Sequence, residues 1–439
     1  MEKRKEAENI FLAGVESVLP NKLIHSQVKL SDDILYFADE CQLPLAGFNH
    51  IYILGAGKAS ALMAKEMEII LDGKITKGHV IVKYGSDCGL HRINVTEAGH
   101  PFPDRNGVNA TNEILKIAGQ AAEKDLVICL FSGGASALLA DYPAGSTLEE
   151  LILMNQLLVK SGADIREINT VRKHLSRVKG GQLAKAIYPA TVVSLILSDV
   201  VGDAVDVIAS GPTCADGSTF KEALQVLDKY HLLEKIPTSM LAHLQAGLLN
   251  LVPETPKVDD PVFAQVRNLI IGSNQLALEV AAVKSLEYGY SPFILTAELS
   301  GDLTDVADFV LASAYRIKND AKIKKPVCLL AGGEPTIHVT EKGLGGRNQH
   351  FALYCATKIS EKEGLTVLCT GTDGNDGPTD VAGAVVDCDT VENALKKSID
   401  PQAYLKRQDS FHFFDQYGGQ VITGSTMTNV MDLVVVLID

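Results

Sequence analysis

The sequence predicts an α/β protein, with a Rossmann-like parallel sheet in an N-terminal domain and a mixed sheet in a second α/β domain. Short apolar runs that end in Gly, Ser or Asp precede helical patterns at 51–60, 125–134, 192–203 and 268–274. This alternation is typical of β-α units, and continuous Val, Ile and Leu runs indicate strands buried on both faces. Such sheets carry their ligands at the carboxyl ends of the strands.

The chain of 439 residues is long enough for about two to three domains. Apolar residues at helical spacing over 3–18 predict a covering helix before the first strand. A composition shift at 249–266, which holds three of the sixteen prolines, places a boundary near residue 255. We therefore expect a Rossmann-like domain over 1–255 and a second domain over 256–439. There TIHVT (336–340) follows the preceding strand so closely that the sheet should be mixed.

Composition and charge exclude several classes of protein. The 40 Lys and Arg against 54 Asp and Glu leave a net charge of −14, which disfavours nucleic-acid and membrane partners. No apolar run approaches the ~20 residues of a membrane span, and the start MEKRKEAENIF lacks the apolar core of a secretory signal. Eight cysteines without a CxxC motif indicate buried thiols in a reducing compartment. We expect a cytoplasmic protein with a small-molecule substrate and leave its oligomeric state open.

The segment Gly55-Ala-Gly57-Lys58 ends an apolar strand and begins a helix, so its backbone N–H groups can bind an anion. A dinucleotide fingerprint would need a third glycine at Ser60 and an acidic residue after the next strand, which ends in Lys83 instead. A cation at Lys58 opposes the helix dipole, which favours an anionic partner over a solvated lysine.

The turn Ser132-Gly133-Gly134 closes another apolar strand and can present backbone N–H groups to phosphate oxygens, or it can be a tight turn alone. The GxSxG and HExxH motifs are absent from the chain, so serine hydrolase and zincin interpretations lose their main support.

Two further segments of the first half bear charge. The basic stretch 168–181 includes Arg172 and Lys173 and indicates either an anion contact or a solvated helix face. Asp199 follows an apolar strand, where a carboxylate can hold Mg²⁺, orient a hydroxyl group or cap a helix.

The second half repeats the pattern of glycines beside charged residues. Gly345 and Gly346 precede Arg347 and Asn348 at a helix start, an arrangement suited to a phosphate or carboxylate. Three acidic residues lie in nearby glycine-rich segments and are candidate metal ligands or parts of solvated turns: Glu334, Asp373 and Asp376.

These segments together resemble the glycerate 2-kinase family, whose C-terminal part is the MOFRL domain. The resemblance covers nearly the whole chain through GAGKAS (55–60), EAGHPFPD (97–104), SGGASALL (132–139), 161–181, LSDVVGD (197–203), VIASGPT (207–213), GGE (332–334), GGRNQ (345–349) and TDGNDGPTD (372–380). It implies ATP- and Mg²⁺-dependent phosphorylation of the 2-hydroxyl of (R)-glycerate, in a cleft between two domains. It also implies that Lys58 and Arg347 are catalytic.

Within this hypothesis, Asp199 orients the hydroxyl or the metal, and 132–134 and 345–347 hold phosphates through backbone donors. The sequence departs from the family pattern at Ala135, Pro335, His350, Ser425 and Met427, and the last two leave the exact acceptor open. A nicotinamide-dependent hydroxypyruvate reductase and a non-catalytic sugar-acid or nucleotide-binding protein are the alternatives.

Overall fold

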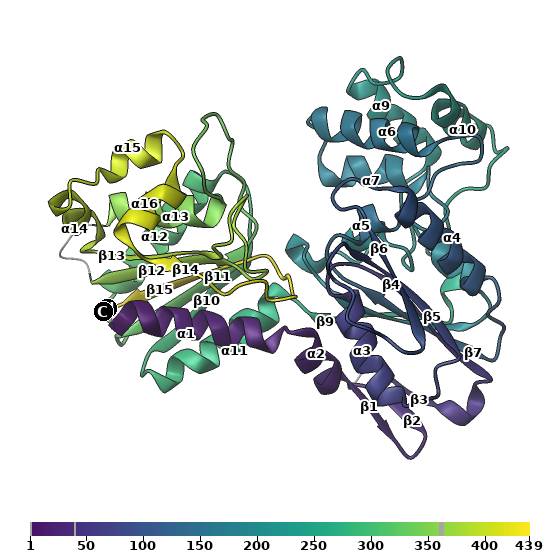
Figure 1. Ribbon diagram of the computed structural model, residues 1–439, viewed down its shortest axis with the longest axis horizontal. Helices are drawn as coiled ribbons and strands as arrows, with labels where there is room; N and C mark the ends of the chain where they lie inside the picture. The colour runs from purple at the N-terminus through teal and green to yellow at the C-terminus, as the bar shows by residue number, and fades with distance from the viewer. Residues whose placement is uncertain (1, 39–40, 360–363) are drawn as a thin grey trace. The chain divides into compact units, whose positions relative to one another are not determined.

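The computed structural model describes residues 2–38, 41–359 and 364–439, which belong to two compact units (Figure 1). The N-terminal unit comprises Leu23–Ser198 and Asp203–Ile271, whereas the C-terminal unit comprises the residues before Leu23, Asp199–Gly202 and Gly272–Asp439. The division therefore falls at Ile271 and not near residue 255, and the first helix belongs to the unit that lies far from it in sequence.

The N-terminal unit is built on a parallel six-stranded sheet in the order β6-β5-β4-β7-β8-β9. Its strands are β4 (His50–Ala56), β5 (Lys77–Lys83), β6 (Ile93–Ala98), β7 (Asp125–Phe131), β8 (Thr191–Leu197) and β9 (Val266–Gly272). Counted along the chain this is the order 3-2-1-4-5-6 of doubly wound nucleotide-binding sheets, in which ligands bind where the order reverses. That point lies between β4 and β7. The predicted boundary near residue 255 would place 268–274 in the second domain, but β9 joins the first sheet.

Helices surround this sheet and also form a layer of their own. Around the strands lie α2 (Pro20–Gln27), α3 (Ser60–Leu71), α4 (Arg105–Ala118), α5 (Ala135–Leu138) and α8 (Gln182–Ile187). The layer consists of α6 (Leu148–Lys160), α7 (Ile165–Lys173), α9 (Phe220–Lys229) and α10 (Thr238–Leu248) (Figure 1). Its core includes Leu158, Val171, Leu227 and Met240. A small antiparallel sheet of β1 (Val28–Ser31), β2 (Ile34–Phe37) and β3 (Cys41–Pro44) completes the unit.

The C-terminal unit contains a mixed six-stranded sheet in the order β10-β11-β15-β12-β13-β14. The strands are β10 (Ser291–Leu299), β11 (Val327–Gly333), β12 (Leu365–Gly371), β13 (Gly383–Asp387), β14 (Gln420–Val421) and β15 (Asp432–Ile438). The mixed character is confirmed, since β10 and β11 are parallel while β15 is antiparallel to both its neighbours. The reason differs from the prediction, because 336–340 forms no strand and contributes a single bridge between Asp302 and Thr336.

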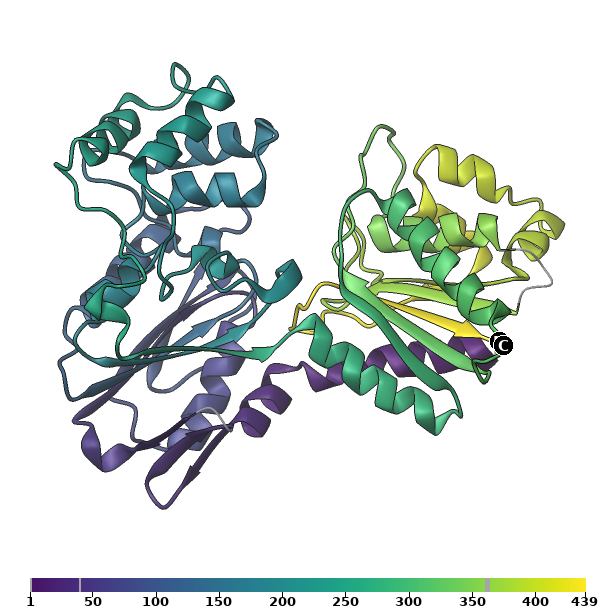
Figure 2. The ribbon, with the colours of Figure 1, turned by 180° about the vertical axis from the view of Figure 1, so that it is seen from behind.

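Helices cover both faces of the mixed sheet. On one face α1 (Glu2–Ser17) lies along α11 (Asn274–Glu287), and on the other lie α12 (Leu303–Asn319) and α13 (Arg347–Lys358) (Figures 1 and 2). The smaller helices are α14 (Thr390–Lys396), α15 (Pro401–Lys406) and α16 (Ser410–Tyr417). The helix predicted over 3–18 is thus confirmed, and it packs on the C-terminal sheet. In the described part of the chain, no helix combines the length and apolar character needed to cross a membrane.

The pH dependence of stability follows from four histidines, because burial lowers the pKa values of His79, His100, His243 and His350. Below pH ~6.5 these side chains bind protons more readily in the unfolded chain than in the folded one. We therefore expect the four histidines to lower the free energy of unfolding as the pH falls from 7 towards 5, whereas Asp432, whose pKa burial raises to about 6, acts in the opposite direction. Chemical denaturation at several pH values measures this, and His79→Gln should flatten the slope. An unchanged slope in that variant would contradict the assignment.

Candidate active site

The loops after β4 and β7 interlock at the point where the strand order of the N-terminal sheet reverses. The Lys58 backbone N–H donates to the Gly133 carbonyl at 2.9 Å, and the Ala59 N–H donates to Ser132 Oγ at 3.0 Å. A Cβ on Gly57 would lie 2.1 Å from Ser132 Oγ, so only glycine permits this close approach. Ser132 is buried, its hydroxyl fixes the two loops, and its backbone N–H donates to the Ala56 carbonyl at 3.2 Å. A phosphate contact through the backbone N–H groups of Gly133 and Gly134 stays a prediction.

Lys58 and His100 meet beside the glycine turn. Gly134 has a φ of +84°, and a Cβ built on it would lie 2.8 Å from His100 Nε2 and 3.5 Å from Lys58 Cγ. Burial, followed by the charges of Lys58 and Lys83, lowers the pKa of His100 and keeps its ring neutral at pH 7. These residues follow β4, β5 and β6, so cations gather at the carboxyl edge of the sheet. This edge is suited to an anion.

Sequence reasoning did not single out His100 as a site residue. The available signal was its position in 97–104, a segment that follows directly on β6.

The basic stretch 168–181 is largely neutralised from within the N-terminal unit. Lys173 Nζ lies 3.3 Å from Asp216 Oδ1 and 3.8 Å from Asp206 Oδ2, and its side chain is only 6% exposed. The predicted substrate contact of Lys173 is therefore replaced by internal ion pairs.

Arg172 differs from its neighbour. Its Nε donates to Asn155 Oδ1 at 2.8 Å, burial lowers its pKa, and no ion pair of Arg172 is found within the described ranges. Arg172 remains a candidate anion contact.

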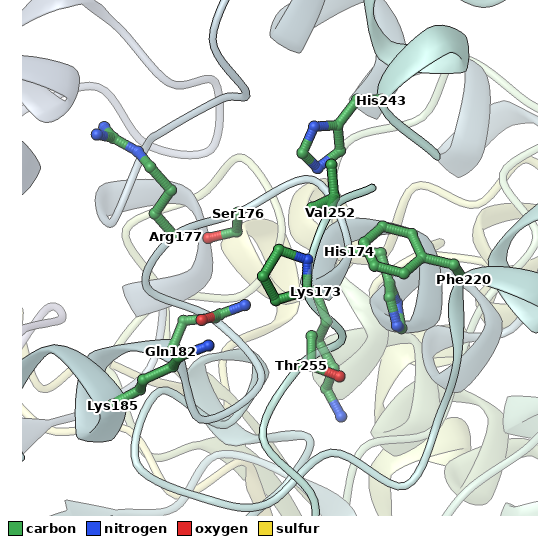
Figure 3. Close-up of a pocket in the computed structure, with 11 residues that line it drawn as sticks. Lys173, His174, Ser176, Arg177, Gln182, Lys185, Phe220, His243, Val252 and Thr255 are labelled. Atoms are coloured by element: carbon green, nitrogen blue, oxygen red, sulfur yellow. The ribbon is translucent and has the colours of Figure 1, made fainter. Parts of the chain in front are cut away.

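A pocket of about 180 Å³ lies beside this stretch (Figure 3). It is lined by Lys173, His174, Ser176, Arg177, Gln182, Lys185, Phe220, His243, Val252, Pro253 and Thr255. His174 Nε2 lies 2.8 Å from Glu254 Oε1, and Arg177 donates to Asn112 Oδ1 at 2.8 Å. In Figure 3 the guanidinium of Arg177 points away from Lys173 and His174. Lys173, His174 and Arg177 are thus engaged with protein partners.

In the C-terminal unit, Asp376 binds the N-terminal end of α13. Its Oδ1 accepts from the Asn348 backbone and side-chain nitrogens at 2.9 and 3.2 Å, and its Oδ2 accepts from those of Gln349 at 2.8 and 3.0 Å. The carboxylate is buried and carries two hydrogen bonds on each oxygen, which saturates its acceptor capacity. The structure therefore assigns Asp376 to helix capping and not to the predicted metal binding.

The same network surrounds the predicted phosphate loop before α13. Asn348 is buried, and besides Asp376 its amide contacts Asp432 Oδ1 and Cys369 Sγ, each at 3.0 Å. A Cβ on Gly346 would lie 2.3 Å from Asp376 Oδ1, and one on Gly345 would lie 2.3 Å from Ser410 Oγ. These glycines permit close internal packing, and the side-chain amide of Asn348 is engaged within the protein. A phosphate contact through the backbone donors of 345–347 stays a prediction.

Arg347 lies between a buried and an exposed carboxylate. Its Nε and Nη2 donate to Asp432 Oδ2 and Oδ1 at 2.5 and 3.0 Å, and Nη1 lies 2.9 Å from Glu334 Oε1. Burial raises the pKa of Asp432 to about 6, although Arg347 acts in the opposite direction. Burial would lower the pKa of the Arg347 guanidinium, but the negative charges of Asp432 and Glu334 outweigh this effect and raise it. The guanidinium therefore stays charged. The Arg347 side chain remains 33% exposed and can reach a ligand.

The loop 424–429 packs against the end of β12. Thr426 donates from Oγ1 to the Thr372 carbonyl at 2.6 Å and from its backbone N–H to the Asp373 carbonyl at 3.3 Å. Met427 has a φ of +63°, a left-handed conformation that favours glycine. At Met427 the loop thus keeps a backbone conformation suited to glycine and carries a long side chain.

The remaining acidic candidates are Asp199, Glu334 and Asp373. Asp199 follows β8 and is grouped with the C-terminal unit. Within 2–38, 41–359 and 364–439, no group of three or more His, Cys, Asp or Glu side chains could hold a metal ion. The roles of Asp199, Glu334 and Asp373 as metal ligands stay predictions.

Each of the two α/β units carries a cation near the ends of its strands. In the N-terminal sheet it lies at the carboxyl ends, and in the C-terminal sheet it lies beside the end of β11. This arrangement fits an enzyme that acts on anionic substrates. Residues 6–245 match a domain of unknown function, DUF4147, and residues 327–432 match the MOFRL family.

Relatives and a solved structure resemble the chain over most of its length. A glycerate 2-kinase of Pyrococcus horikoshii is 40% identical over 97% of this chain and 95% of its own. A crystal structure of glycerate kinase from Thermotoga maritima shares 38% identity and a TM-score of 0.88, with all of both chains covered. A relative in Agrobacterium vitis, 38% identical over 88% of this chain and 86% of its own, bears a hydroxypyruvate reductase name. The chain belongs to the glycerate 2-kinase family, a family of kinase enzymes.

Gly134→Ala tests the packing of the N-terminal site. A Cβ at this left-handed position would meet His100, so we expect a loss of about 1–3 kcal/mol in unfolding free energy and a shift of His100 away from Lys58. Denaturation and the NMR titration of His100 measure both. Gly85→Ala is the control, because its φ of +80° is similar but its Cβ would meet no atom within 4 Å. Equal effects of the two substitutions would contradict a role for the His100 contact.

Proposed function

We propose that this enzyme transfers the γ-phosphoryl group of ATP to the 2-hydroxyl of (R)-glycerate and forms 2-phosphoglycerate. The observation that carries the proposal is family membership over nearly the whole chain, together with the cationic residue that the family implicates in each unit. Lys58 lies beside the glycine turn at the reversal of strand order, and the Arg347 side chain is 33% exposed. We also expect the enzyme to act in the cytoplasm.

The proposed roles follow the charge changes of phosphoryl transfer. The reaction needs positioned reactants and neutralisation of charge on the phosphoryl oxygens, with little covalent participation by the protein. Lys58 and Arg347 would supply positive charge to the transferred group and to the carboxylate of the substrate. The backbone N–H groups of Gly133 and Gly134 and the guanidinium of Arg172 would contact phosphate oxygens. Asp199 would orient the 2-hydroxyl or hold the metal.

Mg²⁺ fits the remaining donor set. This ion prefers oxygen ligands and usually binds through one or two carboxylates together with substrate phosphates and water. Glu334, whose side chain is 46% exposed, and Asp373 could contribute such oxygens, whereas the saturated carboxylate of Asp376 could not. When bound, Mg²⁺ would neutralise charge on the phosphates. The protein would need to supply few ligands of its own.

The alternatives find less support. A nicotinamide-dependent reductase requires a carboxylate for the ribose hydroxyls at the end of the second strand, and Lys83 ends β5 here. The hypothesis of a non-catalytic binding protein is disfavoured because the chain is similar to kinases over nearly its whole length.

The decisive experiment is an ADP-release assay on glycerate with Mg²⁺ and ATP, in which NMR identifies the phosphorylated position. We expect ADP and 2-phosphoglycerate in equal amounts. ADP with 3-phosphoglycerate would contradict the 2-position, and oxidation of NADH by hydroxypyruvate without ADP would contradict kinase activity.

Lys58→Ala should lower kcat/KM by at least ~100-fold, since the loss of one group that stabilises developing charge costs about 2.7–4 kcal/mol in the transition state. The melting temperature should change little. Lys65→Ala, on the exposed side of α3, is the matched control and should retain activity. Retained activity in Lys58→Ala would remove Lys58 from the site.

For Arg347→Ala the same loss of activity should come with a loss of stability. The substitution leaves the buried carboxylate of Asp432 without its main partner, and breaking a buried ion pair costs about 3–5 kcal/mol. Activity must therefore be expressed per folded molecule, with the folded fraction taken from denaturation curves.

Met427→Gly tests whether the loop 424–429 adjoins the acceptor. Glycine adopts a φ of +63° without strain, so the unfolding free energy should rise by up to about 1 kcal/mol. Removal of the side chain should change KM for glycerate and the ranking of larger hydroxy acids, while KM for ATP stays within a few-fold. Unchanged kinetics for every acceptor in a folded variant would exclude the loop from the acceptor site.

A further inference from the structure

Asp432 begins the strand β15, which is otherwise apolar over 433–438. The strand lies between β11 and β12, where Asp432 pairs with Gly333 on one side and Gly371 on the other. Its backbone carbonyl also accepts a hydrogen bond from Asn274 Nδ2 at 2.9 Å. Its backbone is therefore held by partners on both sides. The residue is 2% exposed, so its carboxylate is shielded from bulk water.

The carboxylate fixes the plane of the Arg347 guanidinium. Two parallel hydrogen bonds, from Nε to Oδ2 and from Nη2 to Oδ1, form a bidentate pair that permits one orientation of the guanidinium. Asn348 Nδ2 donates to the same Oδ1 at 3.0 Å and holds the carboxylate in place. The guanidinium of Arg347 is thereby anchored to the start of a central strand. Without this anchor, a long side chain at the start of a helix would sample several rotamers.

The bonding pattern leaves part of the guanidinium unengaged by Asp432. Arginine has five N–H donors, and Asp432 engages two of them, at Nε and Nη2, while Nη1 lies 2.9 Å from Glu334 Oε1 in an ion pair. The Arg347 side chain is 33% exposed, so the donors on Nη1 and Nη2 that Asp432 does not engage can bind oxygens of a phosphoryl or carboxylate group.

We propose that Asp432 is the positioning residue of Arg347, which it orients so that the guanidinium donors not engaged by Asp432 face the reacting anion. The inference rests on the proposed function, because it takes Arg347 to be the group that contacts the substrate. Asp432 itself is buried behind Arg347 and touches neither substrate nor nucleotide.

The test is a double-mutant cycle of Asp432→Asn and Arg347→Ala, with kcat and KM measured per folded molecule. Asparagine keeps the shape but loses the charge and one acceptor, so kcat should fall by about 10–100-fold while KM for ATP changes by less than about three-fold. In the Arg347→Ala background, Asp432→Asn should change kcat by less than about two-fold. Additive losses in the cycle would overturn the proposal, and so would an unchanged kcat in the single variant.

A matched control exists in the same unit. Arg4 donates from Nε and Nη2 to Asp387 Oδ2 and Oδ1 at 2.6 and 2.7 Å, which is the same bidentate geometry. Asp387 pairs with Thr366 near the start of β12, whereas Asp432 pairs with Gly371 at its end, so the two carboxylates lie at opposite ends of the strands. Asp387→Asn should therefore lower stability and leave kcat unchanged. An equal fall of kcat in this control would assign the effect of Asp432→Asn to general destabilisation and overturn the proposal.

Asp432→Glu keeps the inference testable if asparagine prevents folding. Glutamate retains the charge but displaces the guanidinium by one methylene group, so kcat should again fall by at least about 10-fold. Wild-type kcat in this variant would overturn the proposal. Absence of ADP release by the wild-type chain would overturn the proposed function and this inference together, whereas wild-type turnover with an unaffected Asp432→Asn variant would overturn the inference alone.

Discussion

The C-terminal unit depends on the compensation of two carboxylates that are buried at the start of α13. Asp376 and Asp432 are both excluded from water, and an ionised carboxylate without partners would cost several kcal/mol there. The first residues of the helix provide the compensation, since Arg347, Asn348 and Gln349 donate hydrogen bonds to the two carboxylates. One network of hydrogen bonds therefore fixes the start of α13 against the start of β15 and sets the direction of the Arg347 guanidinium.

The N-terminal unit meets a different constraint, which is the close approach of two neighbouring strand ends. The strand order reverses between β4 and β7, so the loops that follow them share one small space. Glycine at 57 and the hydroxyl of Ser132 allow the loops to interlock without charged groups. The backbone of Lys58 is held by this contact, so the position of its side chain at the sheet edge follows from packing.

The fold could be predicted from the sequence as far as local patterns determine it. Apolar runs identified β4, β5, β7, β8 and β9, and the helix α1 followed from its spacing. An apolar run does not reveal which sheet it joins, and for this reason the boundary that a composition shift placed near residue 255 separates β9 from the sheet to which it belongs. The segment 336–340 alternates like a strand, but its backbone makes one isolated bridge. Tertiary pairing decided these cases, and tertiary pairing has no local signature.

For the site, charge alone could not separate residues that bind a ligand from residues that stabilise the fold. Lys58 could be singled out because a cation at a helix start opposes the local dipole. Lys173 looked equally suited to an anion, yet its partners Asp206 and Asp216 lie more than thirty positions away in sequence and neutralise it in the interior. Asp432 escaped notice because a lone acidic residue before an apolar strand indicates no pairing. What distinguishes Arg347 from Lys173 is that its buried partner holds one edge of the guanidinium while the side chain stays 33% exposed, against 6% for Lys173. A cation is suited to catalysis when its ion pair orients the charge without covering it, and this combination of burial and exposure can be judged only from the three-dimensional structure.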